Sequence, residues 1–192
     1  MDPINIIIGL NIIATFSANI GAAKQGVKEK VGVFKDKPKT YLQTLPLLLS
    51  TITLVILIIS LFQVGTLEYK QENQIIRISG LIFYLFFSWV QIWSVKTLGE
   101  NYSQDIAIKK NHKLITNGPF KIVRHPQYLS QFLMDIGAAV ATLSFILAPI
   151  ALIQIPFLFK RAALEDKLLE KHFGDSFKDF KKKKGQIFPF IR

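Results

Sequence analysis

Long apolar runs separated by short polar segments dominate the pattern along this chain. Residues 45–66 and 78–95 carry no charge, and each run is close to the roughly 20 residues that a helix needs to cross a bilayer core. Residues 4–20 form a weaker run, diluted by three asparagines. Residues 128–159 are too many for one crossing and contain Asp135 as their only charge. The pattern predicts an all-α integral membrane protein.

The longest apolar run has turn signals in its middle. Ala141-Thr142-Leu143-Ser144 and Pro149 offer turn or kink chemistry. We therefore expect two helices in a tight hairpin, with one long, kinked helix as the alternative. The hairpin gives a bundle of five transmembrane helices, the last two forming the hairpin, followed by a cytoplasmic C-terminal helix.

Basic residues crowd alternate connections between these runs. Residues 21–40 hold six Lys, residues 96–127 hold five Lys and one Arg, and residues 160–192 hold ten Lys or Arg. The link at 66–74 holds only Lys70. The positive-inside rule places the three basic segments in the cytoplasm. This predicts an N-terminus outside and a C-terminus inside, which requires an odd number of spans.

Composition narrows the classes of function. Half of the residues are hydrophobic and the formal net charge is +11. Because the charge flanks apolar runs, it indicates attraction to anionic lipid and predicts no nucleic-acid partner. The absence of Cys excludes disulfides and thiolate metal sites, and the three His lack metal-ligand spacing, so no metal is expected. The first twenty residues carry Asp2 instead of a basic region, so no secretory signal is expected.

Two polar clusters flank the predicted hairpin. The first runs from His112 to Tyr128 and ends immediately before the fourth predicted helix. The second opens the tail, where Arg161 and Glu165 are four residues apart and share a helix face. Interfacial anchoring is an ordinary explanation of the first cluster, and a solvated ion pair is one of the second.

Asp135 lies inside the fourth predicted helix. A charge at this depth costs about 2.5 kcal/mol or more, so it needs a partner or a function. Tyr128 and Gln131 share its helix face, and Gln91 and Gln154 are available as hydrogen-bond partners. A structural interhelical hydrogen bond and a role facing a substrate both remain open.

In their order and spacing, the two clusters resemble the isoprenylcysteine carboxyl methyltransferase family and its phospholipid methyltransferase relatives. The resemblance covers residues 98–192, whereas residues 1–97 match only as hydrophobic helices. It rests on Leu98-Gly99-x-x-Tyr102-Ser103, His112-x-Leu114-Ile115-x-x-Gly118-Pro119-Phe120, Arg124-His125-Pro126-x-Tyr128, Arg161-x-x-x-Glu165-Asp166, Phe173-Gly174 and Pro189-Phe190-Ile191. Phe120 stands where the family usually has Tyr, and Asp166 where a second Glu is usual.

The resemblance implies one domain over residues 1–192, with residues 98–192 as the cofactor-binding and catalytic part. The implied cofactor is S-adenosyl-L-methionine, in a cytoplasmic pocket closed by the tail helix. The implied cofactor-binding residues are His112, Lys113, Leu114, Ile115, Phe120, His125, Pro126, Gln127, Tyr128 and Glu165. Arg161 and Arg124 are implied as catalytic, with Arg161 facing the substrate, and Asp135 is a further expected substrate residue because of its depth.

The type of methyl acceptor follows from the chemistry of these residues. A carboxylate is already ionised and needs a planar cation to orient it, which suits Arg. An amine must first lose a proton, and Asp135 is the residue that favours such an acceptor. We expect methylation of a membrane-embedded prenylcysteine carboxylate. A phosphatidylethanolamine-type N-methyltransferase and a non-catalytic lipid-binding protein remain the alternatives, and the oligomeric state is not predicted.

Overall fold

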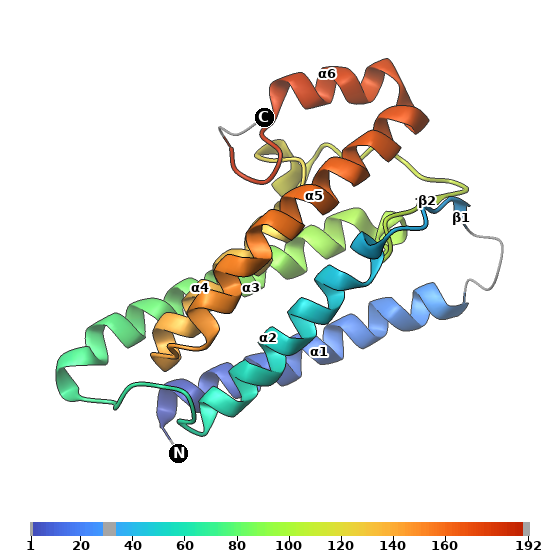
Figure 1. The fold of residues 1–192 in the computed structure, drawn as a ribbon. Coiled ribbons are helices and arrows are strands. Elements are labelled where there is room, and N and C mark those ends of the chain that lie inside the picture. Colours follow the sequence, from blue (N-terminus) through green and yellow to red (C-terminus); the bar gives the residue numbers. More distant parts are fainter. Residues whose placement is uncertain (1, 29–33, 190–192) are drawn as a thin grey trace.

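The computed structural model describes residues 2–28 and 34–189, and for residues 16–28 and 34 only the backbone. The side chains of Lys24, Lys28 and Lys30, and the end of the Pro189-Phe190-Ile191 motif, lie outside the described part. Five long helices and a shorter sixth make up the fold (Figure 1). They are α1 (Pro3–Lys28), α2 (Leu45–Leu61), α3 (Gln74–Leu98), α4 (Pro126–Thr142), α5 (Leu147–Phe173) and α6 (Asp175–Lys183).

Short elements complete the connections, and all of them except η2 lie at one end of the bundle. Strand β1 (Phe34–Asp36) pairs antiparallel with β2 (Ile108–Lys109), with an irregularity between Phe34 and Asp36. Four 3-10 turns are η1 (Tyr41–Gln43), η2 (Gln71–Asn73), η3 (Gly99–Asn101) and η4 (Gly118–Lys121). The two strands join the segment before α2 to the segment before α4, so parts of the chain distant in sequence meet there.

The predicted hairpin is confirmed. Helix α4 ends at Thr142 and α5 begins at Leu147. Between them Leu143 adopts a left-handed conformation with φ 51°, and the Ser144 hydroxyl accepts a hydrogen bond from the Leu147 N–H at 3.2 Å. The serine thus satisfies one of the free N–H groups that begin α5. The alternative of one continuous kinked helix is wrong.

The C-terminal helix differs from the expectation. The residues around Arg161 and Glu165 continue α5 without interruption, although Pro156 lies inside this helix. The helix ends at Phe173 because Gly174 takes φ 57°, a conformation that glycine adopts at little cost. The separate C-terminal helix is α6. The second polar cluster therefore lies on the C-terminal part of α5, whose first part is apolar.

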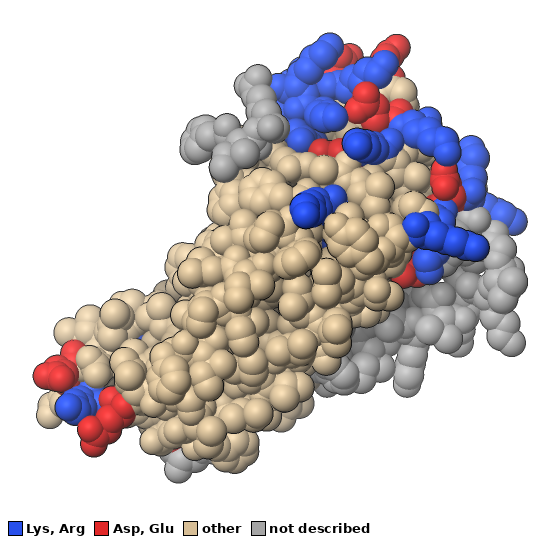
Figure 2. Space-filling view, in the orientation of Figure 1, with Lys and Arg blue, Asp and Glu red and all other residues tan. Residues whose placement is uncertain are grey.

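The protein is a multi-pass membrane protein. Three segments are long and apolar enough to cross a membrane, namely Tyr41–Leu61, Gln71–Asn101 and Leu147–Phe173. The apolar helix Pro3–Thr15 is shorter, and α4 has only 17 residues, so the count of five spans stays a prediction. Figure 2 shows an uncharged belt between a small charged group at one end and a dense group of Lys and Arg at the other. We call the latter the basic end.

The closest helix packing joins α3 to α4 through two glycines. A Cβ added at Gly80 would lie 2.6 Å from the Ala141 backbone nitrogen, and one at Gly137 would lie 2.7 Å from that of Tyr84. Small residues allow such close approach between membrane helices. These contacts fix the position of α4, whose first turn carries part of the site described below.

Gly80→Ala is expected to lower the free energy of unfolding by about 1–3 kcal/mol, the usual cost of overpacking. The added methyl group would press on backbone, which has no room to yield. Gly9→Ala is the matched control, because its Cβ would meet only Leu61 Cδ1 at an ordinary 3.6 Å. Thermal unfolding in detergent measures both variants. Equal melting temperatures for the two would show that the α3–α4 contact does not hold the bundle together.

The end opposite the basic end is tied by a buried cation. The Arg77 side chain donates to both carboxylate oxygens of Asp2, at 2.7 and 3.0 Å, and to the Ala141 carbonyl at 3.0 Å. The Tyr69 ring lies 3.5 Å from the guanidinium carbon. Hydrogen bonding from Arg77 holds the pKa of Asp2 below its usual value. This cluster links the start of α1 and α3 to the end of α4.

Candidate active site

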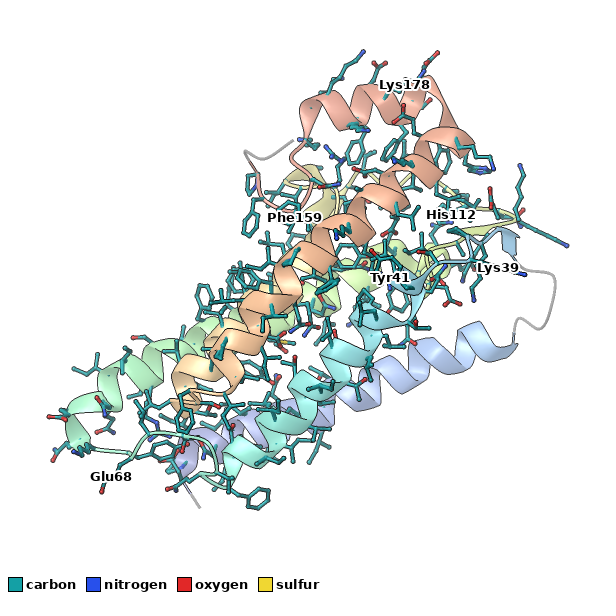
Figure 3. All side chains as sticks on the ribbon, in the orientation of Figure 1. Lys39, Tyr41, Glu68, His112, Phe159 and Lys178 are labelled. Carbon is teal, nitrogen blue, oxygen red and sulfur yellow. The ribbon has the colours of Figure 1, made fainter. Side chains whose placement is uncertain are left out.

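The two polar clusters of the sequence meet at the basic end. Figure 3 shows His112 at the same end of the molecule as Lys178 of α6, and Glu68 at the far end. The segment between α3 and α4 folds back against the last turns of α5, and α6 crosses above them (Figure 1). Two adjoining cavities lie at this end of the molecule.

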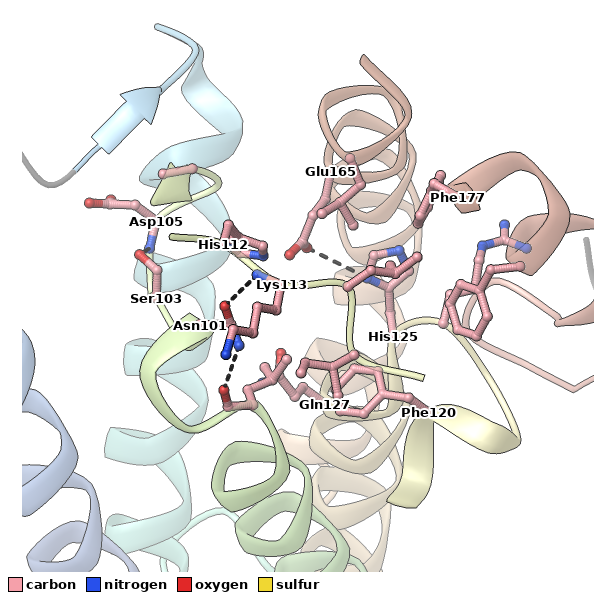
Figure 4. Close-up of a pocket in the computed structure, with 17 residues that line it drawn as sticks. Asn101, Ser103, Asp105, His112, Lys113, Phe120, His125, Gln127, Glu165 and Phe177 are labelled. Carbon is pink, nitrogen blue, oxygen red and sulfur yellow. Dashed lines mark hydrogen bonds and ion pairs between the residues drawn. The ribbon is translucent and has the colours of Figure 1, made fainter. Parts of the chain in front are cut away.

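The first cavity, here the outer cavity, has a volume of about 630 Å³ (Figure 4). Eight of the ten residues implied for cofactor binding line it. These are His112, Lys113, Leu114, Ile115, Phe120, His125, Gln127 and Glu165. Glu165 comes from α5, whereas the other seven come from the segment before α4 or from its first turn. The fold therefore brings together side chains that are more than forty positions apart in the sequence.

The other two residues of that set lie elsewhere. Pro126 is buried and occupies the first position of α4, where its missing N–H costs nothing. Tyr128 lines the second cavity instead of the outer one. Tyr128 nevertheless stays in contact with the group, because its hydroxyl bonds to Glu165 at 2.8 Å and its ring stacks on His125.

The second cavity, here the inner cavity, lies among the membrane helices and has a volume of about 930 Å³. Its walls come from α2, α3, α4 and α5 and from residues 102–105. Ser103, Asp105, Gln127 and Glu165 line both cavities, so the two spaces meet at these side chains. These four side chains therefore form the boundary between the two cavities.

Arg161 lies in the wall of the inner cavity and is only 7% exposed. Its Nη1 donates to the Leu42 carbonyl at 2.8 Å, its Nη2 to the Gln104 carbonyl, and its Nε to the Tyr128 hydroxyl at 2.9 Å. All of these acceptors are neutral. The buried cation therefore has no carboxylate partner within the part of the chain that the structure describes.

The expected ion pair between Arg161 and Glu165 is not formed. Tyr128 stands between them, because its hydroxyl donates to Glu165 Oε2 at 2.8 Å while it accepts from Arg161. His125 Nδ1 lies 3.5 Å from the same carboxylate oxygen. The explanation of this cluster as a solvated surface pair is wrong, since burial and the tyrosine give each charge a separate environment.

Arg124 is buried and its donors are directed away from the inner cavity. Its guanidinium bonds to Asp166 at 2.9 Å through Nη2, and its Nη1 donates to the carbonyls of Lys181 and Lys184. The Arg124 backbone N–H also donates to the Gly185 carbonyl at 2.9 Å. Arg124 lines the outer cavity but holds the chain after α6 in place.

Asp166 belongs to the same buried cluster and lines neither cavity. It accepts from Arg124, from His125 Nε2 at 2.8 Å and from Gln186 Nε2 at 3.2 Å. The shorter side chain at this position, compared with the usual Glu, therefore sits behind the site. The departure from the family pattern leaves the cavity walls unchanged.

Electrostatics at the rim of the outer cavity favour a neutral imidazole. Burial lowers the pKa of His112, Glu165 opposes this effect, and the positive charges of His172 and Lys109 add to it. At neutral pH the ring thus presents an uncharged aromatic face, which packs 5.9 Å from the Phe173 ring. Burial likewise raises the pKa of the Tyr102 hydroxyl.

The buried amide nitrogen of Gln127 is a donor without a partner. Its Nε2 is the one such side-chain atom found in the described part of the chain. Because Gln127 lines both cavities, this donor lies where two ligands would meet. An unpaired buried donor costs about 1–3 kcal/mol, which a ligand atom would recover.

Several lining residues were not identified from the sequence. Asn101, Ser103 and Asp105 belong to the segment after α3, and Phe177 and Phe180 belong to α6. The Tyr102-Ser103 pair of the resemblance was a signal for the first group. For α6, the signal was two Phe three positions apart in a lysine-rich helix. No group of three or more His, Asp or Glu that could hold a metal is found among the described residues.

The model of the isoprenylcysteine carboxyl methyltransferase (ICMT) family matches residues 80–171. The predicted resemblance to this family is confirmed. The eight outer-cavity residues that the resemblance implies for cofactor binding, and Arg161, all lie within the segment that matches the ICMT family. Helix α6, which carries Phe177 and Phe180, lies beyond it.

Relatives and a solved structure agree with this match. The chain is 27% identical over 141 residues to the protein-S-isoprenylcysteine O-methyltransferase of Schizosaccharomyces pombe, covering 72% of this chain and 54% of that protein. It is 30% identical over 136 residues to the Xenopus laevis enzyme, covering 68% and 47%. The chain thus spans about half the length of the curated relatives it matches.

The structure of the eukaryotic intramembrane Ras methyltransferase ICMT has a similar fold. Its TM-score is 0.59 at 20% identity, and the match covers 76% of this chain and 52% of that one. At this identity the likeness concerns the fold alone. It agrees with a helical membrane bundle.

Proposed function

We propose that the protein is an S-adenosyl-L-methionine-dependent methyltransferase that O-methylates the carboxylate of a lipophilic acceptor of the prenylcysteine type. One observation carries the proposal. An outer cavity at the basic end adjoins an inner cavity among the membrane helices, and the inner one is lined by a buried arginine that has no carboxylate partner among the described residues. This arrangement suits a polar methyl donor on one side and a carboxylate with a lipid chain on the other.

The residues of the outer cavity fit the proposed cofactor. S-adenosylmethionine would supply the methyl group from its sulfonium. Glu165 and Asp105 offer carboxylates to its positive charges, Gln127 offers an unpaired donor, and His112 and Phe120 offer aromatic faces. The eight lining residues named above would hold the cofactor. Tyr128, which lines the inner cavity, is proposed to contact the acceptor, whereas Pro126 begins α4.

Arg161 is the proposed carboxylate-binding residue of the inner cavity. A guanidinium fits a carboxylate with two parallel hydrogen bonds. Buried on neutral acceptors, it gains a counter-charge only when an anion arrives, which favours an acidic acceptor over a neutral one. Tyr128 holds its Nε and so restrains the plane of the group.

The main task of the chain in this reaction is to align the methyl donor with the acceptor. In such a transfer a carboxylate oxygen of the acceptor would attack the methyl carbon while the carbon–sulfur bond would break toward sulfur, which would leave an ester and a neutral thioether. No proton is transferred, so no general base is needed. Holding donor and acceptor in line at the junction of the cavities supplies most of the rate. Arg124 is then a positioning residue, because its bonds organise the segment after α6.

An amine acceptor receives less support. It needs a base beside the reacting nitrogen, and Asp135 was the residue that favoured it. Asp135 lines neither cavity, and its carboxylate accepts from Gln131 at 3.0 Å and from Gln154 at 3.2 Å. It therefore lies away from the junction where a methyl group would be transferred.

The lipid chain of the acceptor is proposed to enter from the membrane. Leu47 of α2 lines the inner cavity and is 50% exposed, so the cavity reaches the outer surface of the bundle. The basic end, with most of the described Lys and Arg, is proposed to face the cytoplasm by the positive-inside rule (Figure 2). Membrane lipids and a lipophilic acceptor are the proposed partners.

Two measurements in detergent test the proposal. S-adenosylhomocysteine should bind in calorimetry, and Glu165→Ala should weaken binding about 10–100-fold, the value of a charge-assisted hydrogen bond. Lys167→Ala, an exposed site two positions along α5, is the matched control. Labelled methyl should pass to N-acetyl-S-farnesylcysteine as a base-labile ester. A base-stable product on phosphatidylethanolamine, or the absence of cofactor binding, would overturn the proposal.

A further inference from the structure

Polar side chains continue from the inner cavity toward the middle of the bundle. The deepest cavity-lining residues of α2, α3 and α4 are Ser50, Gln91 and Gln131. All three are polar, although this depth in a membrane bundle usually carries apolar side chains. A plain hydrocarbon chain in this cavity would face amide and hydroxyl groups.

A second polar layer lies one helical turn deeper, about 5.4 Å along each axis. Thr53, Asp135 and Gln154 meet there from α2, α4 and α5, and each is 4% exposed or less. Gln154 Nε2 donates to the Thr53 hydroxyl at 2.9 Å and to Asp135 at 3.2 Å. Within the described part of the chain, Asp135 takes part in no ion pair.

Asp135 determines which way the Gln131 amide faces. Gln131 Nε2 donates to both Asp135 carboxylate oxygens, at 3.0 and 3.1 Å. Because both carboxyl oxygens accept from the amide nitrogen, Asp135 holds the nitrogen end of the amide toward itself. The oxygen end of the Gln131 amide therefore takes no part in the bonds to Asp135. Within the described residues, Gln131 Oε1 receives no hydrogen bond, and Gln131 lines the inner cavity.

We infer that Gln131, oriented by Asp135, is a second recognition point in the inner cavity that binds a hydroxyl or ammonium group on the lipid chain of the acceptor. The inference rests on the proposed function, because it assumes that the acceptor occupies this cavity. It adds a preference, among prenyl-type carboxylates, for an acceptor whose chain carries a hydrogen-bond donor. Asp135 is a positioning residue, acting through Gln131.

The physical reason is the cost of an unpaired acceptor. A hydrocarbon chain displaces water from the cavity and leaves the Gln131 oxygen without a partner, whereas a donor on the chain restores the bond. A site built to receive a hydrogen bond discriminates against analogues that lack it. A chain that carries only an ether oxygen is disfavoured in the same way, because the ether oxygen and the Gln131 oxygen both accept hydrogen bonds and neither donates one.

The test uses two matched acceptors with the full chain in detergent. The first acceptor is N-acetyl-S-geranylcysteine with a hydroxyl group added on its first or second isoprene unit. The second acceptor has a methoxy group at the same carbon instead. The wild-type protein should prefer the hydroxyl compound by about three- to tenfold in kcat/KM, the value of one hydrogen bond. Gln131→Leu should bring this ratio close to one. Ser79→Ala, at an exposed site on α3, should leave it unchanged.

A variant of the same shape keeps the test valid if Gln131→Leu does not fold. Asp135→Asn can both donate and accept, so it releases the Gln131 amide from its fixed orientation. In Asp135→Asn, the ratio of kcat/KM for the hydroxyl compound to that for the methoxy compound should fall, whereas methylation of unsubstituted geranylcysteine should persist. Absence of methylation of every cysteine compound overturns the proposed function. Methylation with a wild-type ratio near one, or with a ratio that neither variant changes, overturns this inference alone.

Discussion

Arg161→Lys is expected to lower kcat/KM for carboxyl methylation by roughly 10²-fold, the usual effect of a misplaced reacting group. Lysine keeps the positive charge but has a single ammonium in place of the planar fork. It cannot hold Leu42, Gln104 and Tyr128 at once and still meet a carboxylate with two bonds. The loss should therefore appear mainly in transfer to the acceptor.

Cofactor affinity separates this effect from unfolding. Arg161 lines the inner cavity and not the outer one, so S-adenosylhomocysteine binding by calorimetry should stay close to the wild-type value. Lys160→Ala removes the adjacent exposed cation and should leave both readouts unchanged. Full activity in Arg161→Lys, or loss of cofactor binding together with activity, would contradict the assignment of Arg161 to the acceptor.

Asp166→Ala is expected to lower the free energy of unfolding by about 3–5 kcal/mol, because it leaves a buried charge without its partner. Arg124 is 5% exposed and pairs with Asp166 at 2.9 Å, and His125 bonds to the same carboxylate. Thermal unfolding in detergent measures the change. The exposed Asp179 is the matched control, since loss of its surface pair with Lys182 should cost less than about 1 kcal/mol.

A double variant distinguishes charge burial from loss of packing. Arg124→Met with Asp166→Leu removes both charges and keeps most of the volume, so it should be more stable than Asp166→Ala. If the double variant were the least stable of the set, the cluster would owe its effect to the shape of its side chains. Either result also shows how far Arg124 stabilises the end of α6, where its side chain donates to the Lys181 and Lys184 carbonyls.

The sequence by itself determined the helical membrane architecture and the α4–α5 hairpin, and its resemblance to a known family identified about half of the outer-cavity residues. Long uncharged runs have few stable structures in lipid other than helices, and the turn residues at 141–144 divide the longest run where α4 ends. The outer-cavity residues followed from the motif His112-x-Leu114-Ile115 and from Glu165. Such motifs can be found from sequence because their spacing is local.

Only the tertiary structure decided how the charged side chains pair. Arg161 and Glu165 share a helix face, which predicts an ion pair, yet the Tyr128 hydroxyl from α4 separates them. The family resemblance implied a catalytic role for Arg124, yet its side chain binds Asp166 and the end of α6. Partner choice depends on which helices pack together and which groups lose water, and the spacing of residues along one helix contains neither.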